Sequence, residues 1–213
     1  MKKFFFFAFM ALSLSAAAQH VTPISFEIVD LKIDSLRALY LSEPMMYRAS
    51  LEMVGQNLAK NAEQIKTAKE ELKDEQNHAK EMGNSLKDAL KMTAALKKIY
   101  GKEEGELKSM QKTVEKQQRK LITNKRLNKE ARDSYSQMLD KQQKELGYSL
   151  REVAERQRSV AELETSIQNW QSALQAYEQE VQQKASELAS LEALYKERQA
   201  TLKTEQKSAK SLQ

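Results

Sequence analysis

Residues Tyr100–Leu107 read YGKEEGEL and place two of the chain's five glycines inside a long run of helix-forming residues. This stretch decides the fold, because it either reverses the chain or lies within one continuous helix. Lys97 and Lys98 precede it, where cations favour a helix C-terminus, and glutamates follow it, where anions favour a helix N-terminus. Gly101 suits the left-handed position that ends many helices, whereas a continuous helix would lose ~1 kcal/mol for each glycine. The sequence therefore predicts a reversal at residues 101–105.

An apolar repeat of seven residues extends away from this stretch in both directions. Before the glycines it comprises Leu51, Leu58, Ile65, Leu72, Ala79, Leu86, Thr93 and Tyr100. In the C-terminal half it comprises Leu139, Leu146, Val153, Val160, Ile167, Leu174, Val181, Leu188, Tyr195, Leu202 and Ala209. The positions three residues after each are mixed, with polar Asn61 and Glu75 among them. Such a pattern is typical of a coiled-coil seam with polar interruptions.

These patterns predict an all-α fold, a long-helix coiled coil that forms an elongated antiparallel helical hairpin or bundle. Only two prolines and five glycines punctuate a chain in which 31% of residues are charged, so turns are too few for a sheet or a many-element domain. The expected order is a short arm at 19–44, a coiled-coil helix at 45–100, the turn at 101–105 and a second coiled-coil helix at 106–213.

The two repeats differ in phase. The first continues across the glycines through Leu107, Val114, Leu121, Asn128 and Tyr135, and Leu139 follows only four residues later. Such a shift indicates either a stutter within one helix or a chain reversal close by. Gly147 is a further candidate for a kink or a second turn, because Ser149 and Glu152 after it have the spacing of a capping box.

Residues 1–18 have the pattern of a cleaved signal peptide. Lys2 and Lys3 precede an apolar run of about ten residues, and Ala16–Ala18 supplies the small residues of a cleavage site before Gln19. Removing this segment removes two lysines, which leaves 33 Lys+Arg against 30 Asp+Glu and lowers the net charge from +5 to +3. No later segment is apolar enough to span a membrane. We therefore expect an exported protein, located in the periplasm of a Gram-negative cell.

The arm at 19–44 differs from the repeat region. Ile24, Phe26 and Ile28 alternate with other residues, as in a strand, and residues 31–40 have the pattern of a short helix. Ser42 is placed to cap the next helix, and Pro44 is tolerated in a first helical turn. The segment is either a small docking arm or the start of a helical bundle.

Residue combinations that would support catalysis are absent from the sequence. The chain contains no cysteine, and its two histidines, His20 and His78, have no second ligand at metal spacing. Neither a glycine-rich phosphate loop nor a nucleophile motif occurs. We therefore expect no enzyme activity, no catalytic residue, no metal and no cofactor.

One stretch is strongly basic. Between residues 112 and 132 only Glu115 and Glu130 oppose eight cations: Lys112, Lys116, Arg119, Lys120, Lys125, Arg126, Lys129 and Arg132. Residues 160–195 have the reverse balance, with six acids opposed only by Lys184. The two stretches either pair along or between chains, or the cations bind an acidic partner such as lipid headgroups, an anionic envelope polymer or an acidic protein. Nucleic acid is excluded by export and by the lack of an aromatic platform.

These features predict a structural or adaptor coiled coil of the cell envelope, self-associated as a homo-oligomer and bound to an envelope protein or an anionic surface. A second hypothesis rests on a resemblance. The exported, basic, helical and cysteine-free chain resembles the Skp/OmpH-type periplasmic chaperones in architecture and charge. That resemblance implies a holdase for unfolded outer-membrane proteins, with helical arms and terminal strands of which Ile24–Ile28 would supply one.

Overall fold

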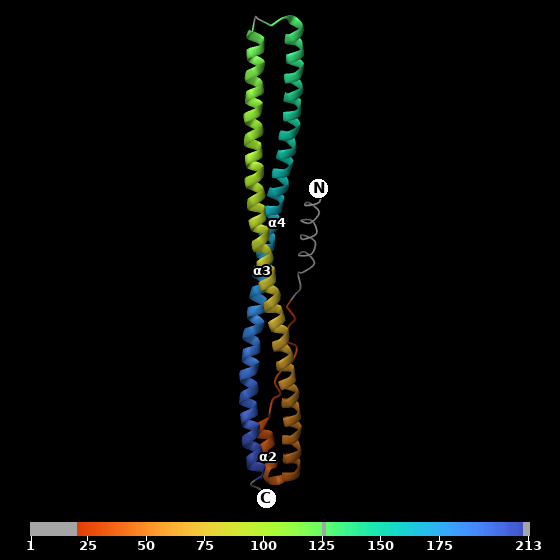
Figure 1. Cartoon of the computed structure of the whole chain (residues 1–213). Coiled ribbons are helices and arrows are strands. Elements are labelled where there is room, and N and C mark those ends of the chain that lie inside the picture. Colours follow the sequence, from red (N-terminus) through yellow and green to blue (C-terminus); the bar gives the residue numbers. More distant parts are fainter. Residues whose placement is uncertain (1–20, 125–126, 211–213) are drawn as a thin grey trace. The chain divides into compact units, whose positions relative to one another are not determined.

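The regular structure of the chain is entirely helical in the computed structural model, which describes residues 21–124 and 127–210. Helix α2 comprises Ile33–Ser42, α3 comprises Pro44–Thr123 and α4 comprises Lys129–Lys210, and no strand occurs among the described residues (Figure 1). The predicted all-α class is confirmed. The predicted signal peptide at 1–18 lies outside the described residues.

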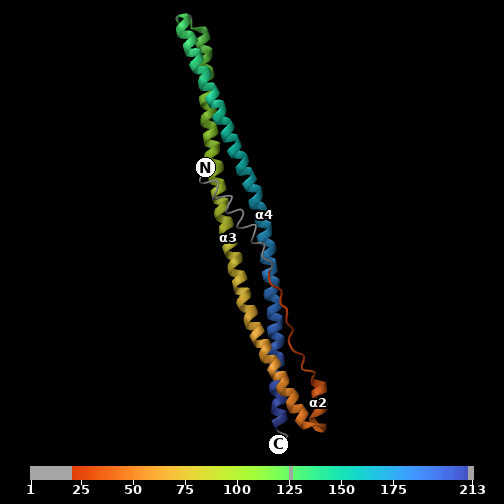
Figure 2. The same ribbon diagram turned by 90° about the vertical axis from the view of Figure 1, so that its right-hand side faces the viewer.

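The helices contribute to two compact units. Unit 1 contains the described residues up to Gly83 together with those from Ala173 onward, and unit 2 contains Asn84–Ser172. In unit 1, Tyr47 of α3 bonds to Glu205 of α4, and Glu75 of α3 bonds to Lys184 of α4. Residue numbers along α4 therefore fall as those along α3 rise. In unit 2 the pairs are Lys97 with Glu164 and Gln118 with Asp140. Within each unit, therefore, α3 and α4 run antiparallel (Figures 1 and 2).

The seven-residue repeat is the buried face of both helices. In α3 the buried members are Leu51, Leu58, Ile65, Ala79, Leu86, Thr93, Val114 and Leu121. In α4 they are Leu139, Leu146, Val153, Val160, Ile167, Leu174, Val181, Leu188, Leu202 and Ala209. Burial of this stripe removes apolar surface from water along each unit and stabilises the helix pair.

The predicted reversal at 101–105 is wrong, because α3 passes through both glycines without a break and no glycine has a positive φ. Two of the glutamates that suggested a helix start form ion pairs within one helix, Glu106 with Lys102 and Glu104 with Lys108. Each pair stabilises the helix by a few tenths of a kcal/mol. Lys97, which suggested a helix end, pairs with Glu164 of α4. The apolar stripe also continues beyond the glycines, and burying it outweighs a glycine penalty of ~1 kcal/mol each.

The chain reverses instead between the end of α3 at Thr123 and the start of α4 at Lys129, where the sequence changes phase. Asn128 begins the next helix by accepting a hydrogen bond from the Ala131 amide at its side-chain oxygen, 2.8 Å away. The four-residue phase shift before Leu139 is thus the signature of a reversal. Helix α4 then runs through Gly147, so the alternative of a second turn there is also wrong.

The glycines therefore provide a test of helix continuity. No atom lies within 4 Å of a Cβ built at Gly101 or Gly105, and both residues are helical. Replacing both by alanine is expected to raise the free energy of unfolding by about 1–2 kcal/mol, because alanine favours the helix by ~1 kcal/mol over glycine. Urea unfolding followed by circular dichroism measures the change. A loss of stability would mean that a turn with positive φ is needed there.

The N-terminal arm forms no strand, so the strand expected over Ile24–Ile28 is wrong. Helices satisfy their own backbone groups and offer no edge to which a strand could pair. The arm bonds to side chains instead: the Thr22 amide donates to Glu75 Oε1 and the Val29 amide donates to Asn61 Oδ1, each at 3.0 Å. Asn61 in turn donates to the Glu27 carbonyl at 2.9 Å. Asn61 and Glu75, two polar interruptions of the α3 stripe, thus bind the arm to α3.

The apolar side chains of the arm join the core of unit 1. Ile28 and Leu31 are buried in a cluster with Leu58 and Leu202, and Phe26 packs against it. The expected short helix is confirmed as α2, and Pro44 begins α3 as predicted. Ser42 does not cap α3, since its hydroxyl donates back to the Ala38 carbonyl at 3.1 Å.

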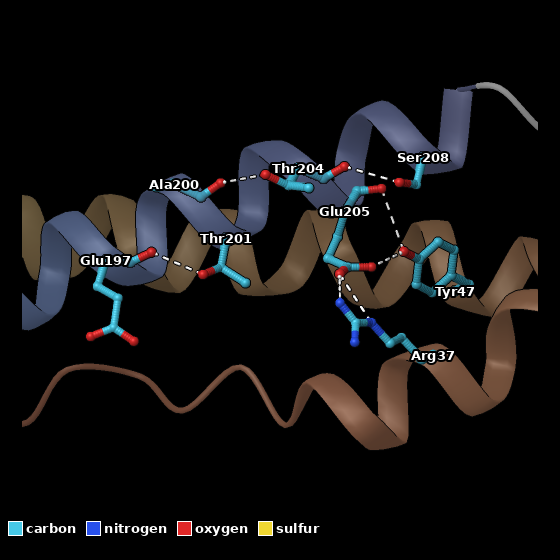
Figure 3. Close-up of polar contacts among 8 residues, drawn as sticks. All are labelled: Arg37, Tyr47, Glu197, Ala200, Thr201, Thr204, Glu205 and Ser208. Atoms are coloured by element: carbon cyan, nitrogen blue, oxygen red, sulfur yellow. Dashed lines mark hydrogen bonds and ion pairs between the residues drawn. The ribbon is translucent and has the colours of Figure 1, made fainter.

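A polar cluster fixes α2 against both long helices in unit 1. The Arg37 guanidinium donates to Glu205 Oε1 at 2.9 Å, and the Tyr47 hydroxyl donates to Glu205 Oε2 at 2.8 Å (Figure 3). Tyr47 is 0% exposed, and its ring meets that of Tyr40 edge to face with centroids 5.3 Å apart. Glu205 occupies a stripe position, and these two donors satisfy its carboxylate there. We call these residues the Glu205 cluster.

The Glu205 cluster makes stability depend on pH in the alkaline range. Burial, and then the hydrogen bond to Glu205 and its negative charge, raise the pKa of Tyr47 from 10.0 to about 12. The folded state therefore favours the neutral phenol, and this contribution is complete below pH 10 and lost as the pH rises from about 10 to about 12. We expect the free energy of unfolding to fall in that window by about 2–3 kcal/mol more than in Tyr47→Phe. Parallel curves for the two proteins would contradict this expectation.

Candidate functional site

Among the described residues, no group of three or more His, Cys, Asp or Glu side chains could hold a metal ion. No helix in the described ranges combines the length and apolar character needed to cross a membrane. His78 is half-buried and meets the Tyr177 ring edge to face, with ring centroids 5.9 Å apart. His20 lies outside the described residues.

Among the described residues of unit 1, one cation is buried, and it links the two long helices. Lys184 is 4% exposed, and its ammonium group lies 2.9 Å from Glu75 Oε1 and 3.5 Å from Glu71 Oε2. Burial, followed by the charges of Glu75 and Glu180, raises the pKa of Tyr177 nearby. Because Glu75 also accepts a hydrogen bond from the Thr22 amide of the arm, this ion pair connects α3, α4 and the arm. Its role is structural.

The predicted basic residues gather at the end of unit 2 where the chain reverses. Lys112, Lys116, Arg119 and Lys120 lie in the last turns of α3, and Lys129 and Arg132 lie in the first turns of α4. All are exposed except Arg132, which is half-buried and donates to the Asn124 carbonyl at 2.8 Å. Lys125 and Arg126 lie outside the described residues. We call the six described cations the basic end.

Half of the basic end lies on one face of α3. Lys112, Lys116 and Arg119 follow the helical spacing of four and three residues, so their side chains share a face. Val114 and Leu121, which are buried against α4, lie on the opposite face. The cations therefore point away from the partner helix and into solvent, where they raise the positive potential of one surface.

The acidic stretch of α4 does not neutralise the basic end within the chain. Glu164 pairs with Lys97 in unit 2, and Glu192 pairs with Lys69 in unit 1. Among the described residues, no ion pair involves any cation of the basic end. The described residues therefore show no pairing of the two stretches along one chain. Pairing between chains stays a prediction.

Exposed apolar side chains accompany the cations, and the sequence reasoning did not identify them. Ile122 is 77% exposed beside the reversal, and Leu127 is exposed within it. Both lie outside the seven-residue repeat, and this position could have indicated from the sequence that they are exposed. An apolar residue that is off the buried stripe, beside a run of cations, is a candidate for an interaction surface.

Further apolar side chains are exposed elsewhere in unit 2. Leu90, Met92 and Ile99 of α3 are all more than 40% exposed. Leu90 also lines a shallow groove of about 640 Å³, together with Ile167 of α4. Unit 2 thus consists of two helices with part of their apolar surface in water.

No protein-family model, curated protein or solved structure matches the chain. Fold and surface chemistry are therefore the basis for assigning it a role.

Proposed function

We propose that the chain is an exported, non-enzymatic coiled-coil protein that acts as a structural or adaptor element of a Gram-negative cell envelope. The carrying observation is the continuous seven-residue stripe, buried in both units, on two helices that expose a basic end and an apolar surface on unit 2. Such a molecule presents two interaction surfaces on a rigid helical support. The signal-peptide pattern at residues 1–18 supports export.

Export has a direct test. N-terminal sequencing of the protein recovered from the periplasmic fraction should begin at Gln19. Recovery of an uncleaved chain from the cytoplasm would contradict the proposed location. Crosslinking in intact cells, followed by purification, should then recover envelope components.

Self-association through unit 2 is the second part of the proposal. Met92 and Ile99, which share one face of α3, and Leu90, on another face, would be buried in a homo-oligomer, which would remove apolar surface from water. Sedimentation equilibrium of the full chain should show an oligomer, and changing these three residues to serine should weaken it by more than about ten-fold. A stably folded monomer at micromolar concentration would contradict this part.

A matched control is available in unit 1. Met45, Met46 and Met53 of α3 are exposed by more than half of their surface. Their change to serine removes a similar number of exposed apolar side chains without touching unit 2. The oligomer should persist in this control, and equal dissociation of both variants would show that the effect is not specific to unit 2.

A holdase chaperone is a second candidate, favoured by the exposed apolar and basic surface of unit 2. The strands expected by resemblance are not formed, since residues 21–32 are irregular and α4 continues to Lys210. An aggregation assay with an unfolded outer-membrane barrel protein distinguishes the two functions. Protection at stoichiometric ratios would favour the holdase, and no protection would exclude it.

A further inference from the structure

We propose that the basic end of unit 2 binds the surface of a bilayer that contains anionic lipid, with Ile122 and Leu127 entering the interface. This inference deepens the proposed function, on which it rests for the envelope location, by assigning the adaptor one of its two partners. Vesicle binding and self-association are measured separately, so either one can fail while the other holds.

The charge of the surface supports an anionic partner. Lys112 and Lys120 mark a stretch of α3 about 12 Å long, and four exposed cations lie along it. Charges separated by no more than a Debye length of ~8 Å act together on a surface potential. Each cation held near an anionic membrane improves binding by about five-fold. The described part of the chain offers these cations no ion pair, so they are available to headgroup phosphates.

Helix stability accounts for only part of this charge. Lysines in the last turns of α3 do complement the negative end of the helix dipole. Lys129, however, is the first residue of α4, where the dipole is positive and a cation is unfavourable. A cation at a helix N-terminus, where the dipole disfavours it, is consistent with binding of an external anion.

The apolar side chains favour a bilayer over a soluble polyanion. Ile122 lies directly before the reversal and Leu127 within it, so both protrude at the same end of unit 2 as the cations. An acidic peptide or an anionic polymer in water offers them no apolar interior. A bilayer offers headgroup charge and hydrocarbon within one interface, as amphipathic membrane-binding elements require. The combination of cations with exposed aliphatic side chains therefore selects lipid.

The test is flotation of the full chain with vesicles of phosphatidylcholine that contain, or lack, about 30% phosphatidylglycerol. We expect binding only to the anionic vesicles and loss of most of it at about 1 M salt. Changing Lys112, Lys116, Arg119 and Lys120 to glutamine should lower the partition coefficient by more than about 100-fold.

The control removes the same charge elsewhere on α3. Lys60, Lys66, Lys73 and Lys80 are exposed, and no ion pair links them to the described residues. Their change to glutamine gives the same net charge as the variant of the basic end, and the two variants have identical N-terminal residues. This control should float nearly as well as the unchanged chain. Equal losses in both variants, or equal binding to neutral vesicles, would overturn the proposal.

A second variant separates lipid from other anions. Ile122→Ser with Leu127→Ser should lower vesicle binding by about ten-fold and leave retention on soluble polyglutamate unchanged. The control, Met45→Ser with Met46→Ser, should bind vesicles normally. If the chain binds polyglutamate tightly and anionic vesicles not at all, the partner is an acidic polymer and the proposal is wrong. All variants should keep the helical circular dichroism of the unchanged chain, because the altered residues are exposed.

Discussion

Lys184→Met is expected to lower the free energy of unfolding by about 3 kcal/mol. Lys184 is 4% exposed and neutralises Glu75, whose side chain is 13% exposed. Without the ammonium group, the Glu75 carboxylate stays in a poorly hydrated position with the Thr22 amide as its remaining donor. Loss of one partner of a buried ion pair costs about 3–5 kcal/mol, because an uncompensated charge is left behind. Urea unfolding followed by circular dichroism measures the loss.

Two further variants identify the cause. Glu75→Met combined with Lys184→Met removes both charges and should recover the stability to within about 1 kcal/mol, because apolar residues of similar volume can replace a buried ion pair. Lys91→Met removes a cation from an exposed pair with Asp88 and should change the stability by less than about 0.5 kcal/mol. If the double variant were as unstable as the single one, lost packing of the Lys184 stem would be the cause.

Tyr47→Ala is expected to lower the free energy of unfolding by about 4 kcal/mol. The side chain is 0% exposed in the core of unit 1, and truncating a buried aromatic residue typically costs about 3–5 kcal/mol. It also leaves Glu205 Oε2 without its hydroxyl donor. The arm and α2 contact the same region of unit 1, so we expect limited proteolysis to cut the arm faster in this variant.

Matched changes divide this effect into packing and hydrogen bonding. Tyr47→Phe keeps the ring and should lose about 1–2 kcal/mol, the usual cost of leaving a buried acceptor unpaired. Tyr148→Ala removes a tyrosine that is 66% exposed in unit 2 and should change the stability by less than about 0.5 kcal/mol. Equal losses in Tyr47→Phe and Tyr47→Ala would show that the hydroxyl, and not packing, provides the stabilisation.

The phase of the apolar repeat, and not the position of the glycines, marks where the chain reverses. The glycines at 101 and 105 suggested a turn, yet a glycine penalises a helix by only ~1 kcal/mol. The change in repeat phase between Leu121 and Leu139 marked the actual reversal. Phase was the better signal because it reflects the burial of many side chains, whereas the glycines express a local preference.

The basic residues could be found in the sequence, but their arrangement could not. Their identity follows from counting charges between residues 112 and 132. Their position at one end of unit 2 follows from the reversal between α3 and α4, and the exposure of Ile122 follows from the face that α3 turns toward α4. A sequence pattern lists such residues, whereas the helix pairing determines which of them share a surface.

Residue order alone was enough to specify the helical class and the face that each long helix buries. Helical periodicity is a local property, so a seven-residue apolar repeat encodes the buried stripe without knowledge of the partner. Asn61 and Glu75 carried no such information, since they appeared only as polar interruptions. Their function became visible when folding brought the arm to them across more than thirty residues of chain. Hydrogen bonds between distant segments depend on three-dimensional packing, and for that reason the attachment of the arm was determined by the tertiary structure.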